Sequence, residues 1–156
     1  MVSKRRLVRI KAMEVLYAHK ISRDHIDKVK KDLLSELTDL EKYNFASDLI
    51  DAVLKNQAAI DGYIESKIKN WDMERLAILD MIILRIGIAE MLYFPEIPPK
   101  ASINEAIEIA KMYSTAKGPV FINGILDALL RDFNSLNLIN KSGRGLLELK
   151  KKDDEK

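Results

Sequence analysis

The sequence predicts an all-α protein of about seven helices, arranged as one compact bundle or as two small helical halves that share a core. Apolar residues make up 47% of its 156 residues, and they recur at helical rather than strand spacing. Gly and Pro are few, at 6 and 4, which suits long helices joined by short loops. We expect one folded domain over residues 1–136 and a polar tail of uncertain order over residues 137–156.

The first expected helix spans residues 3–21. One face of it carries apolar side chains: Val8, Ala12, Val15 and Leu16. A second face mixes basic, apolar and aromatic side chains, with Arg9 at its border: Arg6, Ile10, Met13 and Tyr17. The first face is expected to pack on the core, and the second is consistent with phosphate contacts beside an aromatic surface.

Capping residues place the next helices. Ser22 and Asp24 can each cap a helix that extends to about Leu37. The residues from Thr38 to Glu41 have the form of a capping box and begin a longer helical stretch. Gly62 is expected to mark a bend within this stretch.

A helix expected over residues 73–93, capped by Asp72, is apolar nearly all round and should be the central element. Its three charged residues, Asp80, Arg85 and Glu90, argue against a membrane helix. For Arg85 a buried or half-buried ion pair is expected. For the two carboxylates, internal pairing and the anchoring of a partner protein both stay open.

The C-terminal helices follow a proline-rich loop. Residues 102–105 form a second capping box, which is expected to begin a helix that ends near Tyr113. Pro119 suits the first turn of a last core helix that extends to about Phe133. Gly124 lies inside that helix, where we expect it to permit a close backbone approach.

Positive charge is concentrated at the N-terminus. Five basic residues and no acidic residue precede Glu14: Lys4, Arg5, Arg6, Arg9 and Lys11. The basic residues 150–152 are followed at once by acidic residues 153–155, which largely cancel them. A basic helix of this kind is consistent with nucleic-acid binding, and it is equally consistent with a helix face that is only solvated.

The sequence contains no recognisable catalytic or metal-binding motif. It has no Cys, which excludes disulfides and thiolate metal sites, and its two histidines, His19 and His25, lie in polar surroundings. Nucleotide-binding glycine loops and hydrolase motifs are missing as well. We therefore expect no catalytic residue, no metal and no cofactor. The N-terminus lacks an apolar leader segment, which suits a cytoplasmic protein.

Three blocks of the C-terminal half are distinctive: residues 84–90 (LRIGIAE), 102–111 (SINEAIEIAK) and 121–127 (FINGILD). Together with Arg5, Arg6 and Arg9 near the start, they closely resemble the NusB family of bacterial transcription antitermination factors. The resemblance covers about residues 5–130. It implies an all-helical, non-enzymatic protein that binds boxA-type single-stranded RNA of ribosomal RNA transcripts. Its implied partners are the small-subunit ribosomal protein NusE and the elongating RNA polymerase.

The resemblance also implies site residues. Those expected to contact RNA are Lys4, Arg5, Arg6, Arg9, Tyr17, Tyr113, Lys117 and Phe121. Those expected at the NusE interface are Glu74 and Asp80. Val120 stands where the family commonly has a basic residue, and Lys117 restores positive charge on the same edge. Leu7 shortens the arginine run, and Ala52 replaces a usual Gly.

Two other readings stay open. NusB-like domains also occur in ribosomal RNA methyltransferases, so the chain could be an RNA-binding or protein-interaction module of an RNA-modifying system. It could also be a protein adaptor whose basic helix is only solvated. The sequence leaves the choice between monomer and homodimer open.

Overall fold

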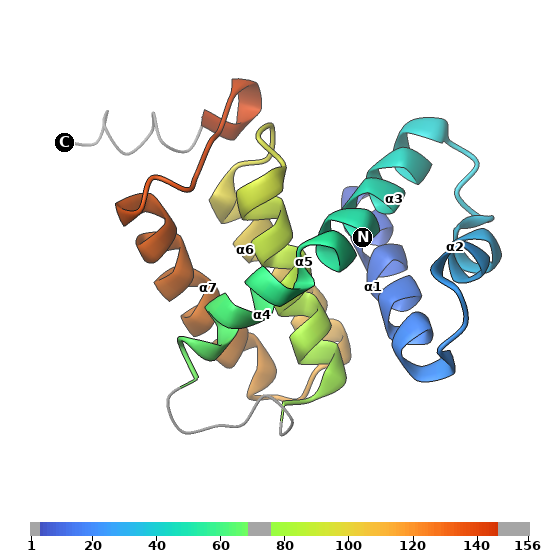
Figure 1. Ribbon diagram of the computed structural model, residues 1–156, viewed down its shortest axis with the longest axis horizontal. Coiled ribbons are helices and arrows are strands. Elements are labelled where there is room, and N and C mark those ends of the chain that lie inside the picture. The colour runs from blue at the N-terminus through green and yellow to red at the C-terminus, as the bar shows by residue number, and fades with distance from the viewer. Residues whose placement is uncertain (1–3, 69–75, 147–156) are drawn as a thin grey trace.

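The computed structural model describes residues 4–68 and 76–146, which form seven α-helices and one short 3₁₀ turn (Figure 1). The first half consists of α1 (Lys4–Ser22), α2 (Ile26–Leu34) and α3 (Leu40–Lys55). The second half consists of α4 (Gln57–Glu65), α5 (Ile78–Tyr93), α6 (Pro99–Tyr113), α7 (Gly118–Ser135) and the turn η2 (Gly143–Leu146). The described residues contain no strand, so the predicted all-α class is confirmed.

Helix α5 is the central element, as its composition predicted. It lies on the side of the second half that faces the first half in Figure 1, and it packs against α1, α3, α4, α6 and α7. Eleven of its 16 residues are buried. Its half-buried Arg85 forms a bidentate ion pair with Asp61 of α4, at 2.8 and 3.0 Å, which confirms the pairing predicted for this arginine. No helix in the described ranges is long and apolar enough to cross a membrane.

Several helix boundaries differ from the expected ones. α3 is capped by Asp39, whose carboxylate accepts from the backbone N–H of Lys42 at 3.2 Å, and not by Thr38. The break before α4 comes at Asn56, so Gly62 lies inside α4 and not at a bend. α5 begins at Ile78, and the expected cap at Asp72 lies outside the described residues.

The prediction that residues 102–105 begin a helix was wrong for a physical reason. α6 begins at Pro99, three residues before Ser102, because proline is preorganised for the first helical turn and needs no N–H partner there. Ser102 is therefore an interior residue of α6, only 1% exposed, and its hydroxyl turns inward. It donates to the Glu90 carboxylate of α5 at 3.2 Å.

The close backbone approach expected at Gly124 occurs at another glycine. A Cβ on Gly87 of α5 would lie 3.1 Å from a methyl of Leu126, so α7 packs directly onto this position. A Cβ on Gly124 would meet nothing within 4 Å. Gly lowers helix stability by about 1 kcal/mol relative to Ala, and Asn by up to about 0.7 kcal/mol. Asn123 and Gly124 therefore both disfavour the helix in which they lie, and the packing of α7 does not require either of them.

The described part of the chain beyond α7 contacts the end of α5. Ser142 donates its backbone N–H to the carbonyl of Pro95 at 3.0 Å. Gly145 is buried against the same carbonyl, where a Cβ would lie only 2.0 Å from the oxygen. This segment therefore covers the C-terminal end of α5, beside the loop that leads to α6 (Figure 1).

Candidate nucleic-acid interface

The basic start of α1 is the first region that the sequence singled out. Lys4 and Arg5 are exposed. The guanidinium of Arg5 lies over the ring of Phe45 on α3, 5.2 Å from its centroid. Phe45 in turn packs edge-to-face on Phe94, with ring centroids 5.9 Å apart. Exposed cations and the half-buried ring of Phe45 thus meet at this end of the molecule, with the buried ring of Phe94 behind Phe45. Cations beside a partly exposed aromatic ring suit phosphates and a stacked base.

Arg6 joins α1 to α6. Its Nε and Nη2 donate to the two carboxylate oxygens of Glu105, at 2.8 and 3.1 Å. These hydrogen bonds, together with the nearby charge of Glu105, raise the pKa of Arg6 above its usual value. Its side chain keeps 22% of its surface exposed. A phosphate could approach Arg6, but it would do so in competition with Glu105.

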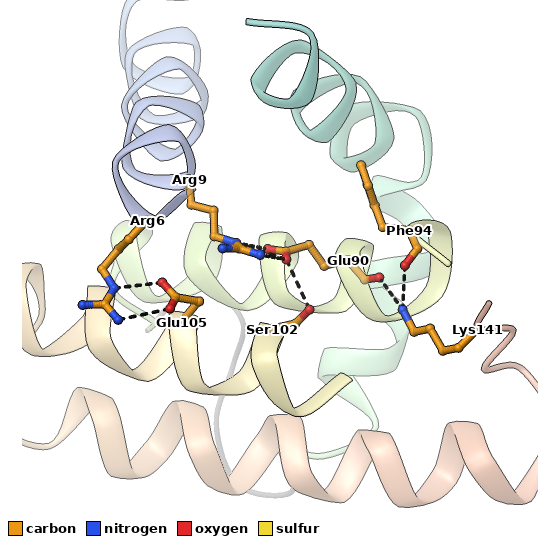
Figure 2. Close-up of polar contacts among 7 residues, drawn as sticks. All are labelled: Arg6, Arg9, Glu90, Phe94, Ser102, Glu105 and Lys141. Atoms are coloured by element: carbon orange, nitrogen blue, oxygen red, sulfur yellow. Dashed lines mark hydrogen bonds and ion pairs between the residues drawn. The ribbon is translucent and has the colours of Figure 1, made fainter. Parts of the chain in front are cut away.

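Arg9 lies in the core. It is 4% exposed, and Ile10 and Met13 of the same expected face are buried too. Its guanidinium donates three hydrogen bonds to the carboxylate of Glu90 on α5, at 2.6, 2.9 and 3.1 Å (Figure 2). The structure therefore corrects the expectation that Arg9 lies on an exposed basic face.

Glu90 is the centre of a small buried polar network. Besides Arg9 it accepts from Ser102 of α6, and its backbone carbonyl accepts from Lys141 at 3.0 Å (Figure 2). Lys141 also donates to the carbonyl of Phe94 at 2.8 Å. Burial alone would lower the pKa of Arg9, but the charge and hydrogen bonds of Glu90 outweigh it, so this pKa is raised. The network connects α1, α5, α6 and the C-terminal segment.

The second candidate region lies at the other end of α5. Asp80 in the first turn of α5 is 9% exposed and accepts from the hydroxyl of Ser114 at 2.6 Å. Together with Lys117 and Phe121 it lines a cavity of about 340 Å³. A residue predicted for the partner protein and two predicted for RNA thus meet at one site. Tyr113, the last residue of α6, is 41% exposed.

The remaining predicted residues that the structure describes lie away from the basic start of α1. Tyr17 is 40% exposed, but it lies twelve residues after Arg5 on α1, which is about 18 Å along the helix. The structure therefore does not bring Tyr17 to the basic start of α1. Tyr113 lies eight residues after Glu105, about 12 Å along α6. Glu74 lies outside the described residues.

A model of the NusB family matches residues 6–131. The chain belongs to the NusB family. One relative, the transcription antitermination protein NusB of Chloroherpeton thalassium, is 45% identical over 156 residues, which is 99% of this chain and 74% of that protein. The NusB protein of Salinibacter ruber is 38% identical over 148 residues, covering 94% of this chain and 92% of that protein.

Solved structures of the NusB family have the same fold. NusB from T. maritima aligns with a TM-score of 0.78 and 32% identity, over 85% of this chain and 94% of that one. A chain from a crystal structure of the antitermination factors NusB and NusE in complex with double-stranded RNA aligns with a TM-score of 0.74 and 25% identity. That alignment covers 85% of this chain and 99% of that one.

Sequence reasoning missed part of this candidate site. Glu105 was not recognised as the partner of Arg6, nor Lys141 as a neighbour of Glu90, because each lies far from its partner in sequence. Glu90 did carry a signal, since a carboxylate on an apolar helix needs a partner.

Removing one member of the buried ion pair should destabilise this NusB family chain strongly. We expect Glu90→Ala to lower the free energy of unfolding by about 3–5 kcal/mol, because it leaves the guanidinium of Arg9 buried without a partner. Urea unfolding followed by circular dichroism measures this. The control is Glu96→Ala, an exposed carboxylate two residues beyond Phe94, where a change within about 0.5 kcal/mol is expected. Similar losses for both variants would contradict the assignment.

Proposed function

We propose that this chain is a transcription antitermination factor that binds boxA-type single-stranded RNA of ribosomal RNA transcripts together with the ribosomal protein NusE. It acts in the cytoplasm by assisting the elongating RNA polymerase, and it performs no chemical reaction. Membership of the NusB family supports this proposal, and so does a structural neighbour solved with NusE and RNA. The observation that carries it is the exposed, positively charged start of α1 beside the rings of Phe45 and Phe94.

The basic residues have different roles in this proposal. Within the described part of the chain, neither Lys4 nor Arg5 forms an ion pair with a carboxylate, so both are open to phosphates. Arg6 contributes from its pair with Glu105 at the edge of the surface. Arg9 supports α1 from inside, through Glu90.

The cavity at the start of α5 is the second contact region of the proposal. Lys117 and Phe121 line this cavity and offer a cation and an aromatic ring to RNA. Tyr113, the exposed last residue of α6, does not line it and is a separate candidate contact. Asp80 lies in the same cavity and offers a carboxylate to NusE. A site at which RNA and protein residues meet would explain a partner that strengthens RNA binding. Tyr17 is exposed and stays a candidate RNA contact of its own.

A binding titration tests the proposal. A labelled boxA-type RNA is titrated with the chain alone and with the chain plus NusE, and anisotropy is recorded. Scrambled single-stranded RNA and a duplex of the same composition serve as controls. We expect boxA-type RNA to bind at least about tenfold more tightly than scrambled RNA in the presence of NusE, a difference of about 1.4 kcal/mol. Equal affinities for boxA-type and scrambled RNA, both with and without NusE, would refute the proposal.

Charge removal at the start of α1 should weaken RNA binding in a salt-dependent way. Arg5→Ala and Lys4→Ala should each lower affinity and reduce the slope of log K against log salt by about 0.7, the value for one phosphate contact with a single strand. The control is Lys55→Ala, an exposed lysine about 15 Å along α3 from Phe45. Helicity should be unchanged in all three. An equal effect of Lys55→Ala would mean that only net charge matters.

A further inference from the structure

A polar groove between α6 and α7 has no role in the site described above. Its volume is about 440 Å³. The apolar side chains of Ile103 and Leu130 lie in it, and three asparagines line it: Asn104, Asn123 and Asn134. Asn123 is two residues from Phe121, about 200° around α7, so the two residues face different sides of the helix. The groove is therefore separate from the cavity that Phe121 lines.

The three asparagines have no visible structural purpose. All are exposed positions within helices, where Ala would be more favourable. Within the described ranges, none of their side chains forms a hydrogen bond. Gly124 adds to the cost, because it follows Asn123 and no neighbouring atom requires its missing side chain. Residues that disfavour a helix, line one groove and have no internal partner point to a ligand.

We propose that this groove is an additional RNA-binding subsite, which holds one nucleotide of the strand that binds the start of α1. This inference rests on the proposed function. Asparagine amides both donate and accept hydrogen bonds, as the edges of unpaired bases require. Asp127 in the same groove can accept from an exocyclic amine, and the exposed guanidinium of Arg131 can bind the phosphate. The partly exposed Leu130 offers apolar surface to the face of the base.

The position of the groove favours RNA over a peptide as its occupant. Figure 2 shows the start of α1 directed at α6, with α7 running along the other side of α6. Arg6 binds Glu105 on the side of α6 that faces α1, and the adjacent residue Asn104 lines the groove with α7. A strand that crosses α6 from the start of α1 therefore reaches the groove directly. The volume lies within the range of pockets that hold small organic groups.

Two substitutions separate binding from folding. Asn123→Ala and Gly124→Ala both introduce a better helix former at an exposed position, so the midpoint of thermal unfolding should stay the same or rise. Affinity for boxA-type RNA should nevertheless fall, by about fivefold or more for Asn123→Ala, the lower bound for loss of a bidentate base contact. Gly124 adjoins Asn123 but does not line the groove, so Gly124→Ala should leave RNA affinity unchanged and controls for the gain in helix stability. A second control is Gly62→Ala on α4, whose Cβ also meets nothing within 4 Å.

An RNA series with one abasic nucleotide at each position identifies the base in the groove. One abasic position should weaken binding to the wild-type chain but cause no further loss in Asn123→Ala. Wild-type affinity in Asn123→Ala, together with weaker binding by Arg5→Ala, would overturn the subsite and leave the proposed function intact. Loss of NusE binding with unchanged RNA affinity would also overturn it, since the groove would then be a protein surface. A lowered unfolding midpoint would assign Asn123 a structural role instead.

Discussion

The structure depends most on the buried ion pair between Arg9 and Glu90. It joins α1, which carries the basic residues, to α5, around which the other helices pack. Two charges removed from water are costly, and their attraction compensates only when the remaining polar atoms are also bonded. Ser102 meets this condition from α6, and no described side-chain polar atom is left buried without a partner. Since a bidentate pair has a narrow geometry, it fixes the rotation of α1 relative to α5.

Because this ion pair fixes the rotation of α1, the neighbouring arginines of α1 lie in different environments. Arg9 faces inward, Arg6 lies at the edge with Glu105, and Arg5 lies outside over Phe45. The same guanidinium of Arg9 lies 5.6 Å from the ring centroid of Phe45, so the internal pair and the external aromatic surface are in contact. A fixed α1 presents its exposed cations without a further ordering cost when RNA binds.

Periodicity was enough to predict the helices and the central place of α5, because both follow from which residues are apolar. It was not enough for Arg9, because a charge beside a core position can turn either way and its partner lies 81 residues away. The capping boxes at Thr38 and Ser102 failed for a local reason. A residue better suited to begin the helix lay within three positions: Asp39 caps α3, and Pro99 is the first residue of α6. The family resemblance supplied RNA and NusE, which the residues alone left open.

The central claim is that Arg9 supports the basic surface from within and does not itself contact phosphate. The most direct test is the salt dependence of boxA-type RNA binding by the double variant Arg9→Met/Glu90→Met, in which both buried charges are replaced by apolar side chains so that neither is left unpaired. The account predicts a folded chain whose slope of log K against log salt equals that of the wild type. A slope reduced by about 0.7, the value of one lost phosphate contact, would contradict it.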